Sequence, residues 1–195
     1  MFKELNTSKR KRLGLLLSLI FLFPSIKNVE ASDNNIPVEM QAAIFLKALS
    51  YDKTITNSNQ SQINIGIIVN PESNKSKSNK DNFIENINSS KSGISTKSIN
   101  TFSVNISSIN DMKKYNLNIL YLTPDLGSLE EVSKIAKENK TLTWSSDPKN
   151  VRNGFASMGV MNKNNRPKII VNLKNAKQEG HEISSQLLKL SEIIE

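Results

Sequence analysis

Residues 63–71, Ile-Asn-Ile-Gly-Ile-Ile-Val-Asn-Pro, are the stretch that decides the fold of this chain. Its side chains are mostly β-branched, and the run stops at Asn70-Pro71, which predicts a buried strand. Gly66 stands alone inside this strand and opens no glycine-rich phosphate loop. We expect it to mark a close approach of the backbone or a bend.

The same pattern recurs downstream. Residues 117–122 form a second near-continuous apolar run that stops at Thr123-Pro124. The other predicted strands are 101–106, 141–144, 155–161 and 168–173. The last two flank a polar turn, so we expect them to pair as an antiparallel hairpin at one edge of the sheet.

Helical periodicity appears between these strands. Apolar residues at i, i+3, i+4 and i+7 predict a helix after Pro37, and shorter patterns predict helices at 80–90 and after Ser128, which could cap its helix. A closing helix is predicted over 183–194, capped by Ser184 or Ser185. Alternating strands and helices predict an α/β fold with three layers, in which helices flank a largely parallel sheet. No linker divides residues 32–195, so we expect one domain there.

The first 31 residues have the layout of a secretory signal. A basic run at 9–12 precedes eleven residues without charge at 13–23, and small side chains stand at Val29 and Ala31. The alternative is a membrane anchor, but such a segment spans only about 16 Å as a helix, against about 30 Å of hydrocarbon. We therefore expect export, cleavage near Ala31 and no membrane span afterwards.

Charge and composition exclude several classes of function. The net charge is +8, but the part after residue 31 holds 20 basic and 16 acidic side chains, which leaves +4. This excess is scattered and only 6% of the chain is aromatic, so no nucleic-acid surface is predicted. The absence of cysteine removes thiol nucleophiles, thiolate metal sites and disulfides.

No catalytic set is recognisable. His181 is the only histidine, and its neighbours in Gly180-His-Glu182 cannot face one another within one element, so a turn histidine is predicted. Glu130 and Glu131 fit the favourable amino end of a helix rather than a catalytic pair. With one histidine and no cysteine, we expect no metal, no cofactor and no enzyme activity.

Three residues are candidates for binding a ligand or a partner. Trp144 lies in a predicted strand near its carboxyl end, where open α/β sheets bind ligands. Simple packing in the core is the favoured alternative for this ring. Arg152 and Lys168 could gather positive charge near the same edge, although solvated surface charge is the usual reason for such residues.

The C-terminal third resembles a known family. Residues 166–190 read RPKIIVNLKNAKQEGHEISSQLLKL, which is similar to the closing signature of the YfiR-like family of exported bacterial proteins. Residues 142–147 and 151–159 resemble that family's preceding strand-turn and glycine-bearing strand, and 37–51 its opening helix. The resemblance implies that Asn172 ties a strand end to a turn and that Leu187, Leu188 and Leu190 pack.

The resemblance also implies a periplasmic α/β domain that acts by binding. The family includes a repressor that contacts the periplasmic part of an inner-membrane diguanylate cyclase. This chain lacks cysteine, so redox control does not carry over, and Tyr51-Asp-Lys-Thr replaces a Trp-Pro found in many members.

Two functions remain in competition, and an enzyme of unrecognised type is a third and least favoured hypothesis. The first is a non-catalytic regulatory or sensor-partner protein that binds an inner-membrane signalling protein. The alternative is a small-ligand binding module accessory to uptake, which would use the strand edge near Trp144 and Arg152. The oligomeric state stays open, with a homodimer among the possibilities.

Overall fold

A computed structural model describes residues 36–90 and 97–195. The predicted signal peptide at 1–31 and its cleavage near Ala31 lie outside these residues and stay predictions. No helix of the described part combines the length and the apolar character needed to cross a bilayer.

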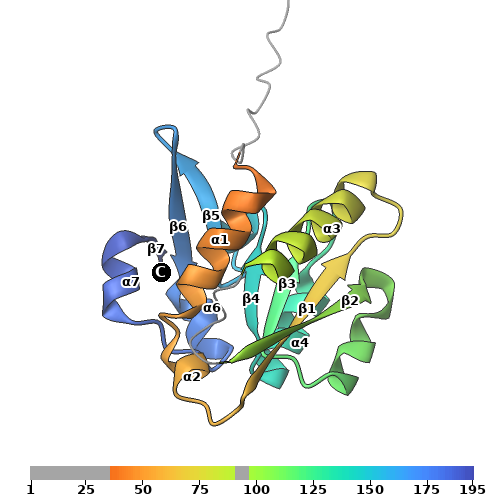
Figure 1. The fold of residues 1–195 in the computed structure, drawn as a ribbon, viewed down its shortest axis with the longest axis horizontal. Helices are drawn as coiled ribbons and strands as arrows, with labels where there is room; N and C mark the ends of the chain where they lie inside the picture. The colour runs from red at the N-terminus through yellow and green to blue at the C-terminus, as the bar shows by residue number, and fades with distance from the viewer. Residues whose placement is uncertain (1–35, 91–96) are drawn as a thin grey trace, which may run out of the picture. The chain divides into compact units, whose positions relative to one another are not determined.

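Seven strands of the described chain form one sheet in the order β2-β1-β3-β4-β5-β6-β7 (Figure 1). The first five in the chain run parallel, β6 is antiparallel to β5, and β7 is parallel to β6. The largely parallel sheet and the C-terminal antiparallel hairpin are therefore confirmed. The strands are β1 (Gln62–Val69), β2 (Ser98–Asn105), β3 (Ile119–Leu122), β4 (Leu142–Ser145), β5 (Met158–Lys163), β6 (Arg166–Asn172) and β7 (Glu192–Ile194).

Helices cover both faces of this sheet, so the three-layer α/β fold is confirmed (Figure 1). On one face lie α1 (Val38–Leu49), α2 (Lys53–Thr56), α3 (Asn74–Ser89), α6 (Leu173–Gln178) and α7 (Ser185–Leu190). On the other lie the 3-10 helix η1 (Ile106–Lys114), α4 (Glu130–Asn139) and α5 (Pro148–Arg152).

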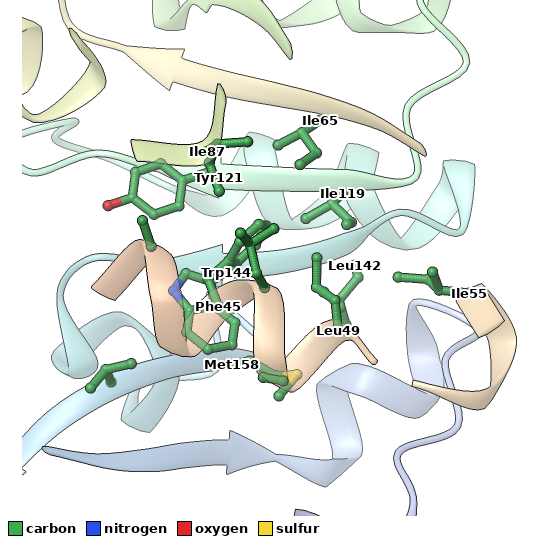
Figure 2. Packing of buried hydrophobic residues seen from close by; sticks show 14 of the residues in the cluster. Phe45, Leu49, Ile55, Ile65, Ile87, Ile119, Tyr121, Leu142, Trp144 and Met158 are labelled. Carbon is green, nitrogen blue, oxygen red and sulfur yellow. The ribbon is translucent and has the colours of Figure 1, made fainter. Parts of the chain in front are cut away.

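Aromatic rings fix α1 and α3 to the centre of the sheet. The Phe45 ring on α1 lies 5.2 Å from Phe83 and 5.2 Å from Trp144, in both cases edge to face. Phe83 stacks on Tyr121 at 3.6 Å. Figure 2 shows Phe45 reaching from α1 toward Trp144 and Tyr121 on the strands. Paired rings add about 0.5–1.5 kcal/mol each beyond the area that they bury.

Gly66 sits at a close approach, but the neighbours are side chains rather than the backbone that was expected. A Cβ there would lie 2.5 Å from Leu117 Cδ1 and 3.0 Å from Leu120 Cδ2. The missing side chain thus leaves room for Leu117 against β1.

Two helix starts differ from the sequence predictions. The helix expected at 80–90 begins at Asn74, because Ser73 Oγ accepts from Ser76 N at 3.1 Å and caps it six residues earlier. Its first turns are polar, so apolar periodicity does not reveal them. The prediction that Ser128 caps α4 is wrong: Leu129 holds the cap position without a side-chain bond, and Ser128 Oγ donates to the Glu130 carboxylate instead.

The end of the chain also differs. The helix predicted over 183–194 is α7 alone, capped by Ser184 Oγ, which accepts from Leu187 N at 3.3 Å. Ser191 Oγ donates back to Leu187 O at 2.8 Å, and the β-branched pair that follows joins the open edge of β6 as β7. Ile194 therefore belongs to a strand. The packing expected of Leu190 is wrong as well, since this side chain is 65% exposed.

Candidate functional site

Open α/β sheets bind ligands at the carboxyl ends of their parallel strands, at the point where the connections from two neighbouring strands leave in opposite directions. From β1 the chain crosses to β2 on one side and then to β3 on the other, which makes the ends of β1 and β3 a topological switch point. The loops that leave these ends are residues 70–73 and 123–129.

These two loops are tied together by their own side chains. Asn70 Nδ2 donates to Asp125 O at 2.8 Å, and Ser73 Oγ donates to Asp125 Oδ2 at 2.9 Å. Below them the buried hydroxyls of Ser76 and Thr123 meet at 2.6 Å. Asp125 places a negative charge near the amino end of α3, where the helix dipole favours an anion. The crevice is therefore occupied by the protein's own polar groups.

Trp144 points into the core beneath α1 rather than toward this edge. Its side chain has no exposed surface and packs edge to face on Phe45 (Figure 2). The indole N–H has no hydrogen-bond partner among the residues that the structure describes. The indole ring therefore packs against α1, and no part of it is exposed to solvent.

Arg152 and Lys168 lie together on the opposite face of the sheet. Arg152, at the end of α5, contacts Met161 Sδ at 3.5 Å through Nη2. Lys168 pairs with Met161 across the β5–β6 hairpin, so their side chains share a face. Arg152 Nη2 also lies 3.7 Å from Glu192 Oε1 on β7. The structure thus brings Arg152 and Lys168 together and separates both from Trp144; a binding role for any of them stays a prediction.

Glu192 is the acidic partner on that surface. Lys163 Nζ donates to its carboxylate at 2.7 Å, and this bond, with the Arg152 charge as a smaller cause, lowers the pKa of Glu192. The carboxylate thus joins β7 to the hairpin and to α5.

A buried contact between a histidine and a carboxylate lies at the other end of the sheet. His181 Nδ1 is 2.5 Å from Asp52 Oδ2, and His181 Nε2 is 3.3 Å from Lys140 O. Asp52 Oδ1 caps α2 by accepting from Thr54 N at 2.8 Å and from Ile55 N at 3.3 Å. Asp52 is 0% and His181 6% exposed, so both groups are removed from water.

A second buried carboxylate lies close by. Glu179 accepts from Thr143 N at 2.9 Å, from Thr143 Oγ1 at 2.7 Å and from Ser157 Oγ at 2.5 Å. Burial raises the pKa of Glu179, while these bonds and the His181 charge oppose the rise. These acid, base and hydroxyl groups are the kinds that catalysis uses, but here they are enclosed and bonded to one another, so a substrate has no access to them.

Sequence patterns do not reveal this cluster. His181 follows the turn between α6 and α7, in keeping with its prediction as a turn histidine, but no pattern assigned a role to Asp52 or Glu179. Asp52 followed by Lys-Thr-Ile is a readable helix cap, but nothing local pairs it with a histidine 129 residues away. The unusual signal was a lone histidine between two glutamates, Glu179 and Glu182.

A small cavity is lined by described residues. A cavity of about 110 Å³ opens at the amino ends of β3 and β4, lined by Met112, Asn116, Leu117, Leu120, Asn139 and Thr141. Typical ligand pockets measure about 300–1,000 Å³. Within 36–90 and 97–195 no group of three or more histidine or carboxylate side chains could hold a metal ion.

Comparison with protein families gives a match over nearly the whole described chain. The model of the YfiR/HmsC-like family matches residues 38–192. The members of this family are periplasmic regulatory proteins without catalytic function. Comparison with curated proteins found no match.

Solved structures share the fold at low identity. A domain from Streptococcus pneumonia in complex with L-Trp is 16% identical with a TM-score of 0.58, over 81% of this chain and 62% of that one. CD0873, a substrate binding protein from Clostridium difficile, is 17% identical with a TM-score of 0.57, over 82% and 60%. A conserved domain protein from vibrio cholerae is 14% identical with a TM-score of 0.56, over 83% and 61%. This chain spans about three fifths of their length, and at such identity the likeness is one of fold.

Proposed function

This chain belongs to the YfiR/HmsC-like family, and on that premise we propose that it is a non-catalytic periplasmic regulator that binds the periplasmic part of an inner-membrane signalling protein of the diguanylate cyclase class. The family match across residues 38–192 is the observation that carries the proposal. The enclosure of the acid–base cluster supports a role in binding rather than in turnover.

The end of the sheet at β7 is the surface that we assign to the partner. β7 is an edge strand, so one side of its backbone is open to pairing. Ile193 on this strand is 42% exposed, and Leu190 just before it is 65% exposed. Exposed apolar side chains surrounded by polar ones are characteristic of protein-binding surfaces.

The charge on this surface favours an acidic partner. Arg152 at the end of α5 and Lys163 at the end of β5 pair with the Glu192 carboxylate, and Lys168 on β6 lies on the same face of the sheet. We therefore expect the partner to present an extended segment with apolar and acidic side chains. Such a segment can add to the β7 edge and place its carboxylates near the cations.

Capture from a membrane extract tests the regulator proposal. The purified protein should retain an inner-membrane protein that has a periplasmic region and a cyclase domain, and that region, made alone, should bind directly. Ile193→Asp should weaken binding by about tenfold or more, a loss of about 1.4 kcal/mol. Met40→Asp is the matched control, because Met40 on α1 is exposed to nearly the same extent, 44%.

Two results would contradict this proposal. One is the recovery of no signalling protein with the wild-type chain. The other is an equal loss of binding in Ile193→Asp and Met40→Asp, which would show that β7 has no particular role in binding the partner. A further pair of variants tests the role of charge. Lys168→Glu should weaken binding, and Lys134→Glu is its control, because Lys134 is an exposed lysine on α4.

A second candidate function is the binding of a small solute. The fold shared with a domain in complex with L-Trp and with a substrate binding protein favours it. A thermal-shift screen that includes L-tryptophan tests it: a ligand at about 100 times its Kd adds about 2.7 kcal/mol, or about 5–10 °C in Tm. The absence of any shift across amino acids and other small solutes would remove this candidate.

A further inference from the structure

The segments around Asp52 and His181 form one junction between regions far apart in the chain. Lys53 N donates to Glu182 O at 2.9 Å and Ser184 N donates to Tyr51 O at 3.0 Å, on either side of an antiparallel bridge between Asp52 and Ile183. Thr54 Oγ1 accepts from Glu182 N at 3.0 Å. We call residues 51–54 and 179–184 the latch.

We propose that the latch is a proton-dependent switch, in which His181 holds a proton between Asp52 and Lys140 O and releases the junction when that proton is lost. Both ring nitrogens face acceptors, a carboxylate at 2.5 Å and a carbonyl at 3.3 Å. A neutral imidazole carries one N–H and can donate to one of them. The imidazolium can donate to both, so the geometry fits the charged form.

The donors around Asp52 fit the same assignment. Its Oδ1 already accepts two backbone N–H groups at the start of α2. These bonds suit an ionised carboxylate, which leaves the proton of the short contact on the ring of His181. The pair is then neutral as a whole, which is the condition for keeping two ionisable groups out of water.

The other charged groups around His181 make loss of its proton unfavourable. Glu179 is the second buried carboxylate and interacts with the His181 charge. Lys140 turns away, since its Nζ donates to Gln178 O at 3.0 Å, and Lys53 forms an exposed ion pair with Glu182. A neutral His181 would leave the buried carboxyl groups of Asp52 and Glu179 without the positive charge that they face.

The direction of the response follows from these contacts. At acidic pH the imidazolium makes both bonds and the latch is closed. As the pH rises, the ring keeps one bond and the buried carboxylates lose their counter-charge, so the latch loosens. The segment that it positions is the one leading into α7, because Ser184 both donates to Tyr51 O and caps that helix.

The sole histidine of the chain gives a direct test. In protein purified without a histidine tag, the imidazole ¹⁵N signals report His181 alone. We expect both ring nitrogens to be protonated near about pH 5, and their deprotonation toward about pH 8 to coincide with faster amide exchange at Ser184, after correction for the intrinsic pH dependence of exchange. A neutral ring throughout this range in the wild-type protein would overturn the proposal.

Variants provide the second measurement. We expect the wild-type Tm to fall by about 2–4 °C more than that of His181→Gln or Asp52→Asn over the same pH range. Lys53→Gln is the matched control, because it removes the exposed ion pair of the latch and should keep the wild-type fall. An equal fall in wild type and His181→Gln would refute the switch, and the NMR result decides the matter if the variants do not fold.

Discussion

Gly159→Ala is the substitution for which the structure gives the sharpest expectation. Gly159 lies on β5 opposite Ser145 of β4, and these strands pair over two residues only, Trp144 with Met158 and Ser145 with Gly159. A Cβ at 159 would lie 2.8 Å from Ser145 O and 3.2 Å from Val151 Cγ2. The closer atom belongs to the backbone, so relief requires moving a strand.

Two opposing effects set the magnitude. Alanine restricts the unfolded chain more than glycine, which stabilises the fold by about 0.4–1 kcal/mol where the site allows it. Overpacking in a core costs about 1–3 kcal/mol. Because the clash is with a backbone oxygen at the shortest pairing of the sheet, we expect the cost to prevail by about 1–2 kcal/mol. In a domain of this size that is a fall in Tm of about 2–8 °C.

Urea and thermal unfolding of the purified protein measure this difference. The matched control is Gly66→Ala, also in a strand, where the added Cβ would meet Leu117 Cδ1 at 2.5 Å and Leu120 Cδ2 at 3.0 Å. These are the far ends of flexible side chains and can turn aside, so Gly66→Ala should cost less. If Gly159→Ala were as stable as wild type, or less harmful than Gly66→Ala, the reasoning from backbone contact would be refuted.

Two further outcomes follow from buried groups. Phe45→Ala should lower the free energy of unfolding by about 3–5 kcal/mol, because Phe45 is fully buried among Phe83, Tyr121 and Trp144; a loss below about 1 kcal/mol in urea unfolding would contradict this. Glu179→Gln should flatten the pH dependence of Tm, because burial raises the pKa of Glu179 in the folded protein. The contribution of Glu179 to stability is therefore full below pH 4.5, its ordinary pKa, and is lost as the pH rises through the higher pKa of the folded state. Parallel Tm curves for wild type and Glu179→Gln would count against that assignment.

The parts of the fold that sequence could predict are those encoded locally. Residues 63–69 and 117–122 are almost wholly apolar and end at Asn-Pro and Thr-Pro, so the central strands are visible without any partner. Ser184 is readable as a cap because Leu187 and Leu188 follow it at helical spacing. Asn172 behaves as the resemblance implies: its Nδ2 donates to Val151 O at 3.1 Å and its Oδ1 accepts from Asn175 N at 3.0 Å.

The features that could not be predicted depend on which distant residues meet. Trp144 and Arg152 are close in sequence, but strand pleating and the turn into α5 send them to opposite faces of the sheet. Residues 192–194 read as the end of a helix until β6 provides an edge for them. Asp52 and His181 depend on a contact across 129 residues. The spacing of residue types along the sequence does not encode such long-range contacts.

The absence of cysteine gives the buried pair its significance. An exported domain commonly ties distant segments with disulfides, which respond to redox conditions. Here residues 51–54 and 179–184 are joined by backbone bonds around one imidazolium–carboxylate contact. Replacing such a pair by apolar groups of similar volume often stabilises a protein, so stability alone does not explain its presence. A contact that needs a proton makes the position of α7 depend on pH, and α7 leads into the β7 edge where we place the partner. Proton binding at His181 and partner binding at Ile193 should therefore be coupled, each strengthening the other by the same factor.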